Sequence, residues 1–258
     1  MTYVFDFSGF GIYAGMLARG VAVTLWLTAV STVLGGFVGI AGASISVAGP
    51  RWARTLIATY VELIRNTPFI VQLFFVFFGL PGLGIHIDEM QAAVLAMTVN
   101  LGAYATEIVR AGIDSIPRGQ VQAAQALGLQ GRQVFRHVVL PQALANVFPA
   151  LLSQVLIVML GSAVVSQISV PDLTSAADFI QSRNFRSFES YLIVTVTYLF
   201  LSIVLRQLLN RLGRSLFAGR TPRSPAARPN WPNRWTRWTR WTRFGWRRPQ
   251  TLATERSQ

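Results

Sequence analysis

Five long stretches of this sequence carry no charged side chain, and this feature constrains the fold more than any other. They cover residues 20–50, 66–87, 90–106, 137–171 and 190–205. Their lengths bracket the roughly 20 apolar residues that an α-helix needs to cross a bilayer core. The sequence therefore predicts an all-α integral membrane protein with five transmembrane helices. A short surface helix is expected near residues 7–17, ahead of the first span.

The composition excludes several classes of protein. Of the 258 residues, 52% are hydrophobic and 13% are charged, about half the charged fraction of an ordinary soluble domain. Cysteine is absent, which excludes thiolate catalysis, and two isolated histidines are too few to build a metal site. All 23 basic residues are arginine, whereas a Walker A loop and a Schiff-base enzyme both need lysine. We therefore expect no bound metal and no cofactor in this chain.

The distribution of arginine predicts the orientation in the membrane. Residues 206–258 carry 13 Arg and one acid, a net charge of +12, whereas residues 1–205 have a net charge of +1. Because cytoplasmic segments are enriched in basic residues, we expect the N-terminus outside and the C-terminus in the cytoplasm. The chain then divides into three parts. Residues 1–20 form an external segment with the short surface helix, and residues 21–215 form a five-helix domain that contains a prominent cytoplasmic loop at residues 116–144. Residues 216–258 form a basic, disordered tail.

Two of the predicted spans carry informative polar residues. In the third, Asn100, Ala103, Tyr104 and Glu107 have offsets of 0, 3, 4 and 7, which places them on one face of a helix. A charged residue at the bilayer centre costs at least about 2.5 kcal/mol, so this face should meet a partner helix or a water-filled path. In the second span, Pro68 lacks a backbone donor, and we expect the helix to kink or begin there.

Residues 116–144, which we call the elbow, join the third and fourth spans. The pattern predicts short helices over residues 121–127 and 130–137 that meet at Gly128. Small alanines in the first of these helices would let another protein approach its backbone closely. On composition alone, the elbow could equally be an ordinary connecting loop.

Three motifs in this chain resemble those of one transporter family. Ala123-Ala124, Gly128 and Val138-x-Leu140-Pro141 are spaced as in the EAA loop, by which permease subunits of ABC importers dock on their ATP-binding subunits. Residues 62–73 (ELIRNTPFIVQL) resemble the family's E-x-x-R-x-T-P stretch, and residues 103–113 (AYATEIVRAGI) resemble its A-Y-x-x-E-I-x-R-x-G-I stretch. Both are signatures of the polar amino-acid subfamily, and the resemblance covers roughly residues 15–215.

The resemblance implies a non-catalytic permease of type I, the membrane-spanning subunit of an amino-acid importer in the bacterial cytoplasmic membrane. The implied partners are two ATP-binding subunits, a second permease that is identical or paralogous, an external solute-binding protein and the amino acid itself. ATP and Mg would be bound by the ATP-binding subunits. Gln122 stands where the family usually has glutamate, so its amide would replace the carboxylate. The implied docking residues are Gln122, Ala123, Ala124, Gly128, Arg132, Leu140 and Pro141.

The candidates for contact with substrate are polar groups within the spans. A zwitterionic amino acid needs one partner for its ammonium group and another for its carboxylate. The candidates are Gln72, Asn100, Tyr104, Glu107, Gln154, Ser162 and Ser166. A structural alternative is that Glu62 with Arg65, and Glu107 with Arg110, pair at i and i+3 only to neutralise each other.

Two other function classes fit this sequence less well. A secondary transporter or channel would use the same polar face without ATP, but the inverted repeats typical of such proteins are not visible. A membrane-bound enzyme is disfavoured because no nucleophile, base and orienting group occur together.

The basic tail contains a short repeat. Residues 235–243 repeat Trp-Thr-Arg three times, which suits binding to anionic membrane lipids, although a dispensable extension is the alternative. No nucleic-acid partner is expected, because no folded nucleic-acid module accompanies the arginines.

Overall fold

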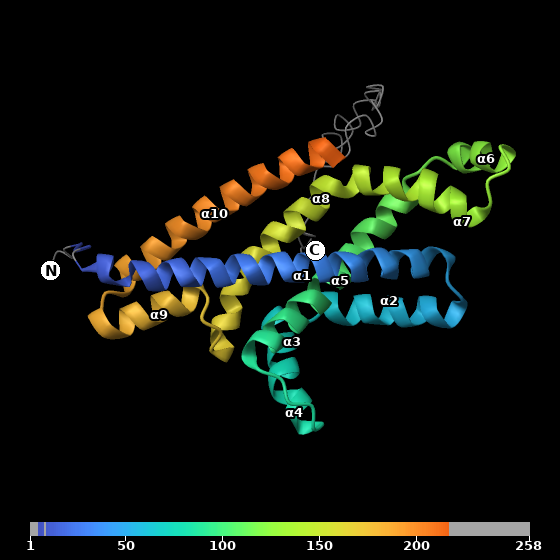
Figure 1. Ribbon diagram of the computed structural model, residues 1–258. Coiled ribbons are helices and arrows are strands. Elements are labelled where there is room, and N and C mark those ends of the chain that lie inside the picture. Colours follow the sequence, from blue (N-terminus) through green and yellow to red (C-terminus); the bar gives the residue numbers. More distant parts are fainter. Residues whose placement is uncertain (1–4, 8, 217–258) are drawn as a thin grey trace, which may run out of the picture. The chain divides into compact units, whose positions relative to one another are not determined.

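A computed structural model describes residues 5–7 and 9–216 of the chain, and within them every regular element is helical (Figure 1). The predicted tail at residues 216–258 lies outside this part from residue 217 onward. In chain order the elements are the 3-10 turn η1 (Phe10–Tyr13), α1 (Ala14–Ala48), α2 (Arg51–Arg65), α3 (Phe69–Phe74), the π-helical turn η2 (Phe75–Gly79), α4 (Leu80–Gly82), α5 (Glu89–Asp114), α6 (Arg118–Ala126), α7 (Gly131–Val134), the π-helical turn η3 (Phe135–Val139), α8 (Leu140–Gly161), the 3-10 helix η4 (Ser162–Ile168), α9 (Leu173–Asn184) and α10 (Ser187–Leu216).

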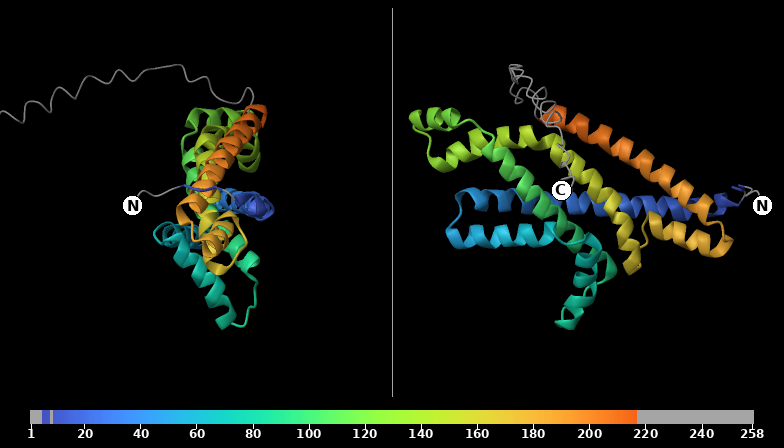
Figure 2. Two further views of the ribbon diagram at one scale, coloured as in Figure 1. Left: turned by 90° about the vertical axis from the view of Figure 1, so that its left-hand side faces the viewer. Right: turned by 180° about the vertical axis from the view of Figure 1, so that it is seen from behind.

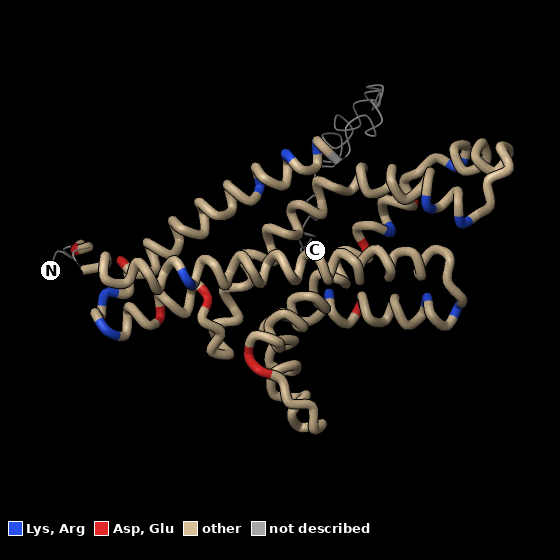
Figure 3. Tube along the Cα trace, viewed as in Figure 1, with Lys and Arg blue, Asp and Glu red and all other residues tan. Residues whose placement is uncertain are grey.

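The described residues contain four helical segments that are long and apolar enough to cross a membrane. They are Phe10–Ala48, Glu89–Asp114, Gly131–Ile168 and Ser187–Ser215. A fifth span exists if Arg51–Arg65 and Phe69–Gly82 count as one, although the two halves are bent by 111°. Figure 3 shows few charged residues along the middles of α1, α8 and α10. The predicted all-α, multi-span fold is therefore confirmed.

The break in the second predicted span occurs at Pro68, as its missing backbone donor led us to expect. Pro68 has extended backbone angles and caps the N-terminus of α3. The carbonyl groups at the end of α2 are bonded instead by side chains: Thr67 Oγ1 donates to Leu63 O at 2.8 Å, and Asn66 Nδ2 donates to Glu62 O, also at 2.8 Å. The chain thus satisfies its own backbone at the bend.

Two features at the N-terminal end of the bundle differ from the predictions. The surface helix expected near residues 7–17 is the single turn η1, which continues into α1 without a boundary at residue 20. Nothing between residues 14 and 20 interrupts the helix, since this stretch has no proline and its only charged residue is Arg19. In addition, α9 was not predicted. Its N-cap is Asp172, whose side chain accepts a hydrogen bond from Ser175 N at 2.8 Å.

The most extensive helix contact joins α1 and α5, and it depends on small residues. Gly35, Gly39 and Gly42 of α1 face α5 so closely that an added Cβ would overlap their neighbours. At Gly39, the added atom would lie 3.0 Å from the carbonyl carbon of Ala105 and 3.1 Å from the nitrogen of the next residue. Close approach of this kind is how membrane helices gain packing energy without a hydrophobic driving force.

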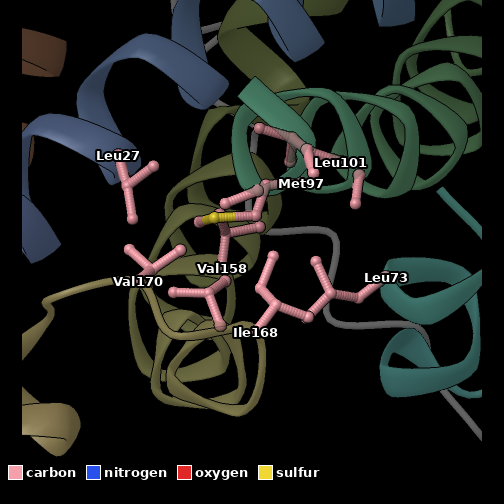
Figure 4. Close-up of a cluster of buried hydrophobic side chains, with 11 residues drawn as sticks. Leu27, Leu73, Met97, Leu101, Val158, Ile168 and Val170 are labelled. Carbon is pink, nitrogen blue, oxygen red and sulfur yellow. The ribbon is translucent and has the colours of Figure 1, made fainter. Parts of the chain in front are cut away.

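A buried apolar cluster joins four of the helical segments (Figure 4). It contains Leu27 of α1, Leu73 of α3, Met97 of α5 and Val158 of α8, together with residues of η4. Each of these four side chains is at least nine-tenths buried. The cluster therefore holds α3 beside α5 and α8, which positions the polar residues described below.

Candidate functional site

The elbow contains two short helices that project at the end of the bundle opposite α9 (Figures 1 and 2). The first is α6, which begins at Arg118, three residues earlier than predicted. It ends in a turn at Gly128, whose φ of +83° lies in the left-handed region that favours glycine. Gly128 N donates to Gln125 O at 2.9 Å, and Leu129 N donates to Ala124 O at 3.2 Å. The predicted turn at Gly128 is therefore present.

The second short helix is not separate from the span that follows it. The prediction ended it at residue 137, whereas α7, η3 and α8 form one unbroken helical segment from Gly131 to Gly161. Pro141 does not interrupt this segment because the π-helical turn η3 directly precedes it and accommodates the ring. The elbow is thus joined directly to a transmembrane helix.

The predicted docking residues divide between the outer surface of the elbow and its interior. Gln122, Ala123, Gly128 and Arg132 are exposed, while Leu140 and Pro141 are half-buried at the start of α8. Ala124 is buried, and it packs in an apolar cluster with Ile113, Val134 and Val139 that fixes α6 on the bundle.

Leu127 was not among the predicted docking residues, yet it is the most prominent apolar group of the elbow. Its side chain is 83% exposed, immediately before the turn at Gly128. The sequence contains a signal that could have identified it, because a leucine at the end of a short helix beside a glycine turn has no neighbouring helix turn to cover it. An exposed leucine at a projecting corner suits contact with another protein.

A hydrogen-bonded pair of amides connects the bend to the third span. Gln72 of α3 donates from Nε2 to Ile64 O at 2.7 Å and to Thr67 O at 3.0 Å, both at the end of α2. Asn100 of α5 donates from Nδ2 to Gln72 Oε1 at 2.9 Å. Gln72 is buried, and its donors replace the backbone bonds lost at Pro68. These two candidates therefore form one unit between α3 and α5.

Tyr104 and Glu107 lie in a separate place, a cavity of about 640 Å³ between α1, α2 and α5, which we call the α2 cavity. The predicted polar face of the third span is therefore divided between two environments. Ala103, its fourth member, is fully buried in the packing. The cavity is lined by Ser46, Arg54, Ile57, Ala58, Val61, Glu62, Arg65, Asn66, Tyr104, Thr106, Glu107 and Arg110.

The two predicted ion pairs have different outcomes. Glu107 and Arg110 pair, with Arg110 Nη2 2.5 Å from Glu107 Oε1, and Arg110 Nη1 also reaches Asp114 at 3.2 Å. Within residues 5–7 and 9–216, Glu62 and Arg65 form no ion pair with each other or with another residue. The Arg65 guanidinium carbon instead lies 5.5 Å from the centre of the Tyr104 ring. Mutual neutralisation thus accounts for one pair only.

The three remaining candidates are on or after α8. Ser162 Oγ donates to Met159 O at 2.7 Å, and Ser166 Oγ donates to Ala163 O at 2.9 Å, so each hydroxyl is bonded within its own helix. Gln154 is buried on α8. Asn100 and three residues of α8, Ile157, Val158 and Gly161, line the same small cavity of about 80 Å³.

Cysteine substitutions should distinguish positions that line the α2 cavity from positions buried between α1 and α5. Tyr104 and Ala58 line the α2 cavity. Cysteines at these two positions are expected to react with a water-soluble thiol reagent at least about tenfold faster than cysteines replacing Leu101 or Ala105. The reason is that access of the reagent to the thiolate governs the rate. Leu101 and Ala105 are buried against α1. The natural chain has no cysteine, so labelling has no background. Faster labelling at Leu101 and Ala105 would mean that the cavity-facing side is misassigned.

A helical bundle with four or five candidate spans, an open cavity lined by charged residues beside α2 and a projecting elbow fits a membrane-spanning transport component. The chain belongs to the family described as "Binding-protein-dependent transport system inner membrane component", whose model matches residues 31–217. It is accordingly a multi-pass protein of the inner membrane, and it is the non-catalytic component of its transporter, in which ATP is hydrolysed by a separate subunit.

Several named proteins are similar over most of their length. The glutamine transport system permease protein GlnP of Escherichia coli K12 is 34% identical over 214 residues, which cover 82% of this chain and 98% of GlnP. The arginine transport system permease protein ArtQ of Bacillus subtilis is 33% identical over 201 residues, 78% of this chain and 92% of ArtQ.

Solved structures agree with this assignment. A chain in the crystal structure of an amino acid ABC transporter with histidines is 34% identical, with a TM-score of 0.76, and the match covers 83% of this chain and all of that one. A chain of the inward-facing MetNI methionine ABC transporter has a TM-score of 0.68 at 23% identity, covering 79% of this chain and 97% of that one, and it supports the fold alone.

Proposed function

We propose that this protein is the permease subunit of an ATP-driven importer that carries a polar amino acid into the cytoplasm. The observation that carries the proposal is the elbow, because a projecting corner that continues directly into a transmembrane helix suits the transfer of movement from an ATP-binding subunit. The names of the similar proteins, which include glutamine and arginine permeases, support an amino acid as the cargo.

The proposed assembly contains two permeases, identical or paralogous, and two ATP-binding subunits that dock on the elbows. An external solute-binding protein delivers the amino acid. In this arrangement the N-terminus is outside and the elbow is in the cytoplasm, in agreement with the positions of the arginines. When the ATP-binding subunits close on ATP and Mg, the unbroken segment from Gly131 to Gly161 moves as a lever.

Gln72 and Asn100 are the proposed first contacts for the substrate within the membrane. Their amides carry donors and acceptors without a net charge, and they lie where α3, α5 and α8 approach one another. An amide pair can bind either end of a zwitterion by exchanging its internal hydrogen bond for one to the ligand. Ser162 and Ser166 have hydroxyls already bonded within their helices, so they take a lesser part.

Uptake by the reconstituted importer tests the proposal. The permease, its ATP-binding subunit and its solute-binding protein are placed in proteoliposomes, and accumulation of labelled L-glutamine or L-arginine is measured with ATP on the side of the ATP-binding subunit. We expect accumulation with ATP and none with a non-hydrolysable analogue. Accumulation driven by an ion gradient without ATP would instead assign the chain to secondary transporters.

Removal of the basic tail provides a further prediction. A chain truncated after Arg220 is expected to retain insertion and uptake, within about twofold of the full chain, because the elbow and the spans precede residue 217. A free peptide of residues 221–258 should bind anionic vesicles and be released by salt, since each surface arginine contributes about 1 kcal/mol of screened attraction. Loss of uptake by a truncated protein present at normal levels would place the tail in the mechanism.

A further inference from the structure

The bend between α2 and α3 is closed by the side chain of Gln72. Pro68 lacks the backbone N–H that would donate to Ile64 O in a continuous helix. Gln72 Nε2 donates to this oxygen instead, at 2.7 Å, and it also reaches Thr67 O at 3.0 Å and Thr67 Oγ1 at 2.9 Å. A backbone carbonyl without a donor is costly inside a membrane. The bend therefore fixes the Gln72 amide with its nitrogen toward α2.

The same amide connects the bend to α5. Because carbonyl groups accept hydrogen bonds and cannot donate them, the Gln72 oxygen must point away from Ile64 O and Thr67 O. Asn100 Nδ2 donates to this oxygen at 2.9 Å. Donation to the oxygen of an amide polarises it and strengthens the bonds that its nitrogen donates. We call the hydrogen bonds of the Gln72 side chain the clasp, and Asn100 supports the clasp from α5.

The segment beyond the bend depends on the clasp for its position. We call residues 69–82 the arm; it contains α3, η2 and α4 and runs away from α1 and α2 (Figure 1). Of the described residues in the arm, only Gln72 and Leu73 are buried. Leu73 packs in the apolar cluster of Figure 4, but lipid tails are as apolar as leucine, so this contact gives little preference for one position of the arm. Among residues 5–7 and 9–216, the bond from Asn100 is the one side-chain hydrogen bond between the arm and α5.

The helix α5 extends from the clasp to the elbow. Near its end, Ile113 packs with Ala124 and Val134 of the elbow. Asn100 and Ile113 are about 20 Å apart along the helix, at 1.5 Å per residue. A rigid helix that packs against the elbow at one end and is bonded to the arm nearer the other can transmit a displacement between them.

We propose that Gln72 is a positioning residue that couples the arm to α5, so that a movement of the elbow changes the bend in the second span. With the clasp closed, Gln72 holds α3 against the end of α2, and the bend has one angle. A displacement of α5 that draws Asn100 away breaks the bond to the Gln72 oxygen and weakens the bonds that the nitrogen donates. The bend is then free to widen, and the arm moves relative to α2. The inference rests on the proposed function, because ATP bound by the docked subunits supplies the movement of the elbow.

The test measures the bend as the distance between two spin labels. Cysteines replace Leu56 on α2 and Leu83 directly after the arm, whose side chains are 61% and 77% exposed, and the natural chain has no cysteine of its own. The labelled permease is diluted with unlabelled permease and assembled with a cysteine-free ATP-binding subunit, so that a complex holds at most one labelled pair. With the clasp intact, we expect one distance without nucleotide and a second distance with ATP and vanadate.

Loss of the clasp should produce the second distance without nucleotide. Asn100→Leu removes the bond from α5, and the ratio of the second population to the first should rise about 3- to 20-fold, the effect of one interhelical hydrogen bond. Gln72→Met removes every bond of the clasp and should raise this ratio at least as much. Because Asn100 acts through Gln72, the double variant should give the same ratio as Gln72→Met alone, whereas independent structural defects would multiply.

Gln154→Met is the matched control for Gln72→Met. Gln154 is a buried glutamine of α8, and within the described residues no hydrogen bond joins it to the arm. This variant should show the single distance of the natural chain. If Gln72→Met does not assemble, Asn100→Leu decides the result alone, because it leaves the bonds at the bend in place.

Distances in Gln72→Met and Asn100→Leu that match those of Gln154→Met would overturn the proposal. A complex that imports L-glutamine but shows one distance with and without nucleotide would also overturn it, as would ratios that multiply in the double variant. Absence of ATP-driven import in the complete system would instead contradict the proposed function, and the distances without nucleotide would still decide whether the clasp holds the bend.

Discussion

Replacing Gly128 with aspartate is expected to lower ATP-dependent uptake at least about tenfold while leaving the protein folded and inserted. The backbone at Gly128 has a φ of +83°, a conformation that costs an L-residue roughly 1–2 kcal/mol. Among residues 5–7 and 9–216, no atom lies within 4 Å of an added Cβ, so the substitution creates no clash with this part of the chain. The new carboxylate would project from the surface on which we propose that the ATP-binding subunit docks, and an unpaired charge in an interface is costly.

Gly84 provides a matched control for this prediction. Its φ is +82°, and an added Cβ there also meets no atom of the described residues within 4 Å. It lies in the loop after α4, on the opposite side of the bundle from α6 (Figures 1 and 2). Gly84→Asp therefore introduces the same backbone strain and the same charge away from the elbow, and uptake should be close to normal. Equal loss of uptake in both variants, at equal membrane levels, would remove the argument for docking.

Replacing Gly39 with leucine is expected to have the largest effect on stability. The added side chain cannot fit between α1 and α5, because even a Cβ would meet the backbone of Ala105 and Thr106. Overpacking of this kind costs about 1–3 kcal/mol, which corresponds to a fall in melting temperature of roughly 2–12 °C for a protein of this size. The measurement is thermal unfolding of the purified protein in detergent, followed by gel filtration.

Gly36→Leu is the control for Gly39→Leu. Gly36 is in the same helix, and in the part of the chain that the structure describes nothing lies within 4 Å of an added Cβ at this position. Leucine has a higher helix propensity than glycine, so this variant should be as stable as the natural protein or slightly more stable. Equal melting temperatures for the two variants would show that α1 and α5 are not packed as described.

Much of the fold could be predicted because the membrane imposes long, nearly uncharged helices. The spans and the break at Pro68 follow from hydropathy and from the missing donor of proline. The helix α9 was not predicted because it has only 12 residues, too few to cross a membrane, and little net hydrophobicity. The continuity of α7 with α8 was not predicted, because a proline inside a helix normally ends or kinks it, whereas at Pro141 the π-helical turn η3 accommodates the ring.

The candidate site was less predictable, because its contacts join distant segments. The sequence selects Gln72 and Asn100 as polar groups within spans, but their hydrogen bond depends on the 111° bend that brings α3 beside α5. The spacing rule predicts that Glu62 and Arg65 pair, whereas a contact across 39 residues draws Arg65 to Tyr104. A rule about neighbours on one helix cannot anticipate a competing partner from another helix.

The central claim, that the elbow binds the ATP-binding subunit, is tested most directly by cross-linking at Leu127. A cysteine replacing Leu127, whose side chain is 83% exposed, is joined by a short bifunctional reagent to its neighbours in the assembled complex. A cysteine replacing Leu83 is the control, since Leu83 is 77% exposed and also precedes a glycine of positive φ. We predict a product with the ATP-binding subunit from Leu127→Cys and none from Leu83→Cys. The reverse result, or no such product from either variant in an active complex, would contradict the claim.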